Sequence, residues 1–145
     1  MARIDGVPEL ISQLERLAGI WDDPELVKAA AGGYVTEQKK LVRAKLNKAP
    51  RGVLEGALQV IPINATTAEA GIPLNTIRYA LAHEFGVVIR PKNKRALAFE
   101  IDGKKIVVQS VTIPARSYVR ASIADGNKAA VKILTKQTIR KIVRG

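Results

Sequence analysis

Apolar residues recur at helical spacing near the start of the chain. Leu10, Leu14 and Leu17 lie three or four residues apart, so they share one face of a helix. The pattern predicts a first helix that begins near Pro8 and ends at Gly19.

A second, longer helix is expected after two aspartates. Asp22 or Asp23 can act as its N-cap, because an aspartate side chain accepts a hydrogen bond from a free backbone N–H of the first turn. Pro24 suits the first helical position. The helix should run to about Lys48, where Pro50 stops it because proline lacks a backbone N–H and forces its predecessor out of the α region.

Gly32 and Gly33 interrupt this helical pattern. Each glycine costs about 1 kcal/mol relative to alanine inside a helix, so the helix is expected to bend or break there. Close packing against a neighbouring subunit is the alternative reason for two adjacent glycines.

The pattern then changes toward period two, which is typical of a half-buried strand. It predicts a strand from Ala57 to Ile63 and an antiparallel return strand from Thr67 to Ile72. The segment from Tyr79 to Phe85 reads as a helix of one or two turns. Gly86 closes this helix, since glycine readily adopts the left-handed C′ conformation.

A β-hairpin is the clearest local signal. Asp102-Gly103 is typical of a two-residue type I′ turn, and this turn fixes the register of both strands. The apolar residues then fall on one face, while Glu100 and Lys105 form an opposite-charge pair on the other. The predicted cross-strand pairs are Ile101–Lys104, Glu100–Lys105, Phe99–Ile106, Ala98–Val107 and Leu97–Val108.

A last helix is predicted from about Asp125 to Val143. Basic residues recur every four positions along it, at Lys128, Lys132, Lys136, Arg140 and Arg144. This basic stripe has two interpretations. It is an ordinary solvated face that suits the helix dipole, or it is a surface that docks a partner or faces DNA.

These elements indicate an α+β fold, in which a long N-terminal helical region and a C-terminal helix pack on an antiparallel β-sheet. A chain of 145 residues is expected to form a single domain. Within it, residues 1–49 should be mainly helical, residues 50–121 should hold the sheet with the short helix and the hairpin, and residues 122–145 should form the C-terminal helix.

Composition limits the function classes. The chain has no cysteine, which excludes a disulfide framework, a thiolate nucleophile and a cysteine-ligated zinc site. Its formal charge of +11 favours an acidic or polyanionic partner. No apolar run approaches the roughly 20 residues that cross a bilayer, so we expect a soluble protein with no membrane partner.

No catalytic constellation is apparent, so an enzyme is not expected. His83 is the only histidine, and no Gly-x-Ser-x-Gly motif is present. His83-Glu84 lacks the second histidine of a zinc-protease helix, because that position is Val87. Without a second histidine, no metal is expected. The glycines match neither a P-loop nor a dinucleotide fingerprint, so no other cofactor is expected. A structural role for His83 beside Tyr79 is favoured.

Two short motifs, one on each side of the hairpin, resemble a known family. The first is Tyr79-Ala-Leu-Ala-His-Glu-Phe-Gly86, and the second is Ile113-Pro-Ala-Arg-Ser-Tyr-Val-Arg-Ala121. The chain from about residue 49 onward is similar to small minor virion proteins of tailed bacteriophages, which complete the tail or join head to tail. The residues that carry the resemblance are Tyr79, Glu84, Phe85, Gly86, Pro114, Arg116, Tyr118 and Arg120.

The resemblance implies a structural protein of the neck, located in the virion and assembled in the bacterial host cytoplasm. It implies a ring of six copies around the DNA channel, in contact with other neck and tail proteins. The basic segment from Val87 to Arg95 is the candidate for an arm between subunits or an element facing DNA, through Arg90, Lys92, Lys94 and Arg95.

Glu84 has two interpretations. It can accept a charge-assisted hydrogen bond from Arg116 or Arg120 and so tie the short helix to the segment after the hairpin, or it can lie exposed to solvent.

Two other function classes remain open. A protein that binds nucleic acid without sequence specificity would explain the charge without a ring, although few aromatic residues are available for stacking. A small hydrolase would have to be built around His83.

Overall fold

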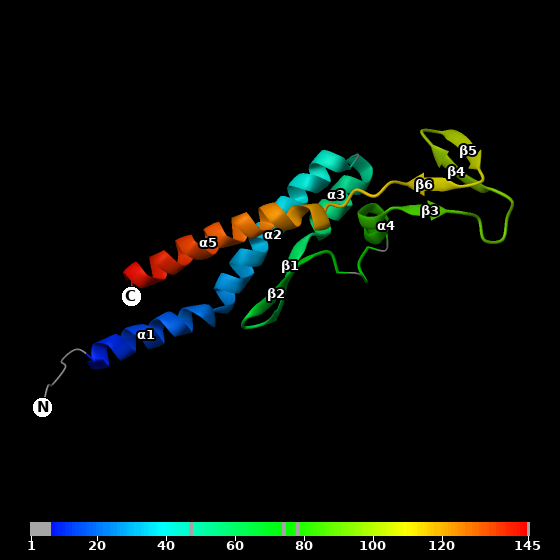
Figure 1. Ribbon diagram of the computed structural model, residues 1–145. Coiled ribbons are helices and arrows are strands. Elements are labelled where there is room, and N and C mark those ends of the chain that lie inside the picture. The colour runs from blue at the N-terminus through cyan, green and yellow to red at the C-terminus, as the bar shows by residue number, and fades with distance from the viewer. Residues whose placement is uncertain (1–6, 47, 74, 78, 145) are drawn as a thin grey trace, which may run out of the picture.

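The computed structural model describes residues 7–46, 48–73, 75–77 and 79–144, and these form an elongated α+β structure (Figure 1). The helices are α1 (Val7–Trp21), α2 (Pro24–Lys45), α3 (Lys48–Ala57), α4 (Ala80–Phe85) and α5 (Ile123–Arg144), with a 3₁₀ turn η1 (Arg120–Ser122) before α5. The strands are β1 (Gln59–Asn64), β2 (Thr67–Gly71), β3 (Val87–Ile89), β4 (Leu97–Ile101), β5 (Lys104–Val108) and β6 (Val111–Ile113).

Helix α2 packs along α5 and is the centre of the molecule (Figure 1). Its N-cap is Asp23, whose Oδ1 accepts a 2.9 Å hydrogen bond from the backbone N–H of Glu25, which confirms the sequence prediction. The carboxylate of Asp23 also pairs with Lys141 near the end of α5. The first turn of α2 is therefore tied to the last turns of α5.

The expected break of α2 at Gly32 and Gly33 was wrong, because the helix is continuous from Pro24 to Lys45. Gly33 is buried where α2 meets α5 of the same chain. A Cβ at this position would lie 3.2 Å from Cδ1 of Ile133 and 3.3 Å from Cβ of Ala129. The close approach of the two helices explains Gly33 without a neighbouring subunit.

Helix and strand boundaries differ from the prediction around Pro50. Helix α2 ends at Lys45, and a separate helix α3 begins at Lys48 and continues to Ala57. Pro50 is compatible with α3 because it lies in the first turn, where backbone N–H groups have no partner within the helix. The strand predicted from Ala57 begins only at Gln59. Helix α1 also runs beyond Gly19, to Trp21.

The main core lies where α2, α3, α4 and the chain after β6 converge. Its buried members include Val42 of α2, Leu46 just after α2, Leu54 of α3 and Tyr118. Strands β1 and β2 pair antiparallel and pack on α2. The buried apolar residues of this core come from segments far apart in the sequence, which fixes α4 and the residue 114–122 segment against the helices.

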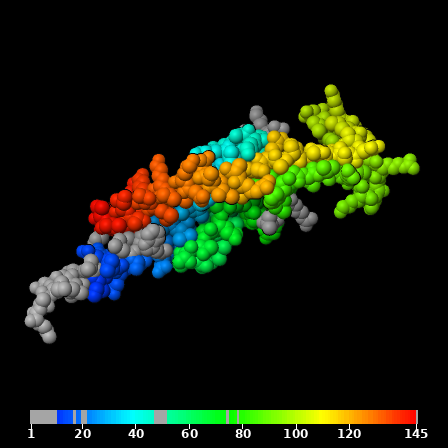
Figure 2. All heavy atoms as spheres, viewed as in Figure 1, coloured from blue at the N-terminus to red at the C-terminus, as the bar shows by residue number. Residues whose placement is uncertain are grey.

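The strands do not form the single sheet that the sequence suggested. Among the described residues they make three separate two-stranded sheets, β1–β2, β3–β6 and β4–β5. Residues 87–113, which we call the arm, contain two of these sheets and project from the helical body (Figures 1 and 2). All five predicted pairs of the β4–β5 hairpin are confirmed. Asp102 and Gly103 have φ values of 51° and 76°, as the predicted turn requires.

Candidate assembly motif and surfaces

The two sequence motifs meet in space at the base of the arm. Helix α4 enters the arm through Gly86, and the chain leaves the arm at Ile113 beside it, because β3 pairs with β6. Gly86 has φ 75° and ψ 155°, so it has a positive φ but is not in the left-handed helical conformation that was expected. A Cβ there would lie 2.8 Å from the backbone nitrogen of Ala115. Glycine is therefore required where the segment that enters the arm packs against the segment that leaves it.

Glu84 makes the polar contacts between these two segments. Its side chain comes from α4 and the residue is only 4% exposed. Oε2 accepts a 2.9 Å hydrogen bond from the backbone N–H of Val119, and Oε1 accepts bonds of 3.1 and 3.2 Å from the backbone N–H and Nε of Arg120. A buried carboxylate is stable only when it is paired in this way. The interpretation of Glu84 as an exposed residue was wrong.

Arg120, rather than Arg116, makes the ion pair with Glu84. Arg116 contributes its backbone: its N–H donates to the carbonyl of His83 at 2.7 Å, and its carbonyl accepts from Nζ of Lys45 at 2.9 Å. The Nε of Arg116 is buried and has no hydrogen-bond partner among the described residues. The predicted bond from Arg116 or Arg120 to Glu84 is therefore confirmed, with Arg120 as the donor.

Tyr118 anchors the second motif in the core. It is 2% exposed, and its hydroxyl donates a 3.3 Å hydrogen bond to the carbonyl of Ala80. Burial, with a smaller contribution from the negative charge of Glu84, raises the pKa of Tyr118 to about 12. The preceding residue, Ser117, has φ 48°, and its N–H donates to the carbonyl of Glu84. Pro114 lies exposed just after β6.

Phe85 and Arg120 form the solvent side of the motif. The guanidinium carbon of Arg120 lies 4.7 Å from the centroid of the Phe85 ring, a cation–π contact. Phe85 remains 58% exposed. The motif therefore has a buried polar centre and an exposed aromatic and cationic face.

His83 has the structural surroundings that the sequence favoured. Its ring lies edge-on to Tyr79, with 5.8 Å between the ring centroids. Burial, and then the charge of Arg116, lowers the pKa of His83 below its ordinary value of 6.5. Within the part of the chain that the structure describes, no cluster of three or more histidine, cysteine or acidic side chains could hold a metal ion.

The predicted basic residues lie on two separate surfaces. Arg90, Lys92, Lys94 and Arg95 are exposed in the arm between β3 and β4, and the first residues of this basic segment form β3. Lys128, Lys132, Lys136 and Arg140 are exposed along α5. A turn of about 100° per residue places this basic stripe roughly opposite Ala130 and Leu134 on α5. The structure does not bring the two basic sets together.

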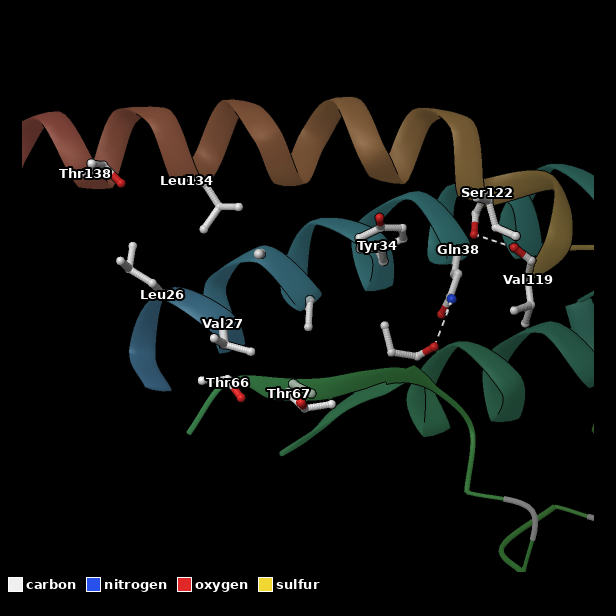
Figure 3. A pocket seen from close by; sticks show the side chains of 15 residues that line it. Leu26, Val27, Tyr34, Gln38, Thr66, Thr67, Val119, Ser122, Leu134 and Thr138 are labelled. Atoms are coloured by element: carbon white, nitrogen blue, oxygen red, sulfur yellow. Dashed lines mark hydrogen bonds between the residues drawn. The ribbon is translucent and has the colours of Figure 1, made fainter. Parts of the chain in front are cut away.

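Sequence reasoning missed an apolar groove between α2, β2 and α5, with a volume of about 610 Å³. Leu26 of α2 and Leu134 of α5 lie across from each other in it (Figure 3). Gln38, only 3% exposed, lies at one end, where its Nε2 donates a 3.1 Å hydrogen bond to the carbonyl of Ala70. Small residues at positions 29–33 of α2 are the sequence signal for such a groove, since they leave space beside the helix.

Comparison of the chain with protein families, curated proteins and solved structures gave no match. No helix in the described part of the chain is long and apolar enough to cross a membrane.

Proposed function

We propose that this protein is a structural component of a tailed-phage virion, located at the junction of head and tail, where it completes the tail or forms part of the neck. In this proposal six copies form a ring around the DNA channel and contact other neck and tail proteins. The protein acts by binding its neighbours, and it is not an enzyme.

The observation that carries the proposal is the joining of the two motifs through Glu84. The resemblance in sequence rests on these motifs, which are separated by the whole arm. In the fold they form one unit, since the carboxylate from the first motif binds Val119 and Arg120 of the second. A shared structural role explains why the two motifs occur together in one chain. The joined motifs support the proposal because they hold the base of the projecting arm in place.

The shape of the molecule also supports an assembly role. The arm exposes apolar side chains that a monomer would be expected to bury, among them Val88, Phe99, Ile101 and Val107. Phe85 adds to this surface at the base of the arm. Six copies, each with a formal charge of +11, would repel one another. The ring is therefore expected to form on a template, with acidic neighbours or DNA to offset the charge.

Deletion of the reading frame in the parent phage or prophage tests the proposal, with electron microscopy of the induced lysate. The expected result is separate DNA-filled heads and unattached or overlong tails. Complementation with the wild-type gene should restore joined particles, which controls for effects on neighbouring genes. Normal infectious particles without the gene would contradict the proposal.

A second candidate function is binding of nucleic acid without sequence specificity. The favouring observation is the basic stripe of α5, whose Lys132, Lys136 and Arg140 have no acidic partner among the described residues. Binding to a DNA duplex would then weaken with salt, with a slope that corresponds to several phosphates. Replacing Lys132 and Lys136 by glutamine should reduce that slope by about 2 if both contact phosphate. An unchanged slope would show that this surface does not bind DNA.

A further inference from the structure

Charge is distributed unevenly along the chain. Positions 1–38 contain seven acidic and three basic residues, whereas the remaining positions contain 21 basic and six acidic residues. The arm alone has six basic and two acidic residues. Glu15, Asp22 and Glu25 of the acidic part are exposed, and Glu25 also pairs with Lys28 of its own helix at 2.9 Å. One chain therefore has a basic arm and a separate acidic surface. The arm of one copy would attract the acidic surface of another copy.

The arm also has an exposed apolar face. The hairpin register places Phe99 and Ile101 on the same face of β4, and they are 36% and 50% exposed. Val107 lies on the opposite face of the hairpin. The arm projects from the end of the body opposite to α1 (Figures 1 and 2). Its apolar face is therefore available to another molecule.

The groove between α2, β2 and α5 has the complementary properties. Its α2 wall, with Leu26, Val27 and Ala30, belongs to the acidic part of the chain. The basic stripe of α5 lies roughly opposite Leu134 of the groove. The groove thus offers apolar walls, and the exposed Asp22 and Glu25 come just before its α2 wall in the chain.

We infer that the arm of one copy docks in this groove of the next copy. The contact uses Phe99 and Ile101 against the apolar walls, while basic residues of the arm approach Asp22 and Glu25. The two surfaces are different, so the contact is head-to-tail and can close into a ring. This inference rests on the proposed ring and names the surfaces that form it.

Disulfide trapping tests the contact directly, because the chain has no cysteine of its own. The full-length variants Ile101→Cys and Ala30→Cys are mixed under mild oxidation and separated without reductant. A disulfide requires Cα atoms within about 7 Å, so only a specific contact favours it. The expected product is a mixed dimer of twice the 15.7 kDa chain mass, several-fold more abundant than either variant forms alone.

Val107→Cys is the matched control, since Val107 lies in the same hairpin and is 61% exposed. It should form little dimer with Ala30→Cys, because it points to the other face. Circular dichroism must show that all three variants are folded. Equal trapping by Ile101→Cys and Val107→Cys, or none by Ile101→Cys, would overturn the inference. If such a protein still occupies the neck of particles, the proposed function stands and only the arm contact fails.

Discussion

The carboxylate of Glu84 accepts a 2.9 Å hydrogen bond from the backbone N–H of Val119, although 35 positions separate the two residues. The neighbouring N–H of Arg120 binds the other oxygen of the same carboxylate. One buried side chain therefore fixes the start of the arm to the segment that follows it.

Glu84→Gln should reduce the free energy of unfolding by about 2 kcal/mol, since an amide replaces a charged acceptor and turns one NH₂ toward the N–H groups. Urea denaturation followed by circular dichroism measures the change. Glu100→Gln is the matched control, because Glu100 is exposed in the hairpin and should change stability by less than about 0.5 kcal/mol. Equal effects of the two substitutions would show that the Glu84 contacts add no stability.

The contact between Gly126 and Tyr34 gives a second prediction. A Cβ at Gly126 would overlap the Tyr34 ring, whereas a Cβ at Gly32 would meet nothing within 4 Å. Gly126→Ala should therefore cost about 1–3 kcal/mol through overpacking. Gly32→Ala should add up to about 1 kcal/mol through helix propensity. Thermal unfolding of both variants checks the opposite signs, and a loss of stability in Gly32→Ala would contradict the described environment of α2.

The raised pKa of Tyr118 predicts that the stability of the protein depends on pH in the alkaline range. The pKa of Tyr118 is raised from 10.0 to about 12 in the folded protein, so the folded state retains the phenol proton longer than the unfolded state. The resulting stability is fully present below pH 10 and is lost as pH rises toward 12. Tyr118→Phe should be less stable at neutral pH by about 1 kcal/mol, from the lost hydrogen bond. Urea midpoints should show this difference narrowing above pH 10, and a constant difference would refute the assignment.

The lowered pKa of His83 predicts that the stability of the protein also depends on pH in the acidic range. Its pKa is lowered in the folded state, so below pH 6.5 the unfolded state binds the proton more readily and stability falls. His83→Gln should lose less stability than wild type when pH drops through this range. Parallel pH profiles for the two proteins would show that His83 is not responsible. Unchanged function of His83→Ala in phage assembly would also argue against a hydrolase built around this residue.

Local signals predicted several elements correctly. The Asp102-Gly103 turn fixed the hairpin register, because a two-residue turn permits only one pairing. The cap at Asp23 was also predictable, since its bond to Glu25 depends on neighbouring residues. The partner of Glu84 was narrowed to two arginines, of which Arg120 makes the bond.

Features that depend on tertiary packing were not predictable. Helix propensity suggested a break at Gly33, but contact with Ile133 requires a small residue in a continuous helix. The strands were expected in one sheet, although the β1–β2 and β4–β5 hairpins each pair only within themselves and β3 pairs only with β6. The groove beside Leu26 and Leu134 arises only when α2 and α5 come together.

The proposed function places this chain at the head–tail junction of a virion. The most direct measurement is gold labelling of purified particles in which the α5 end of the protein has a short tag, since Val143 near that end is well exposed. Gold is expected at the neck, between head and tail, in particles that remain infectious. Infectious particles without label, or with label along the tail or on the head surface, would contradict it.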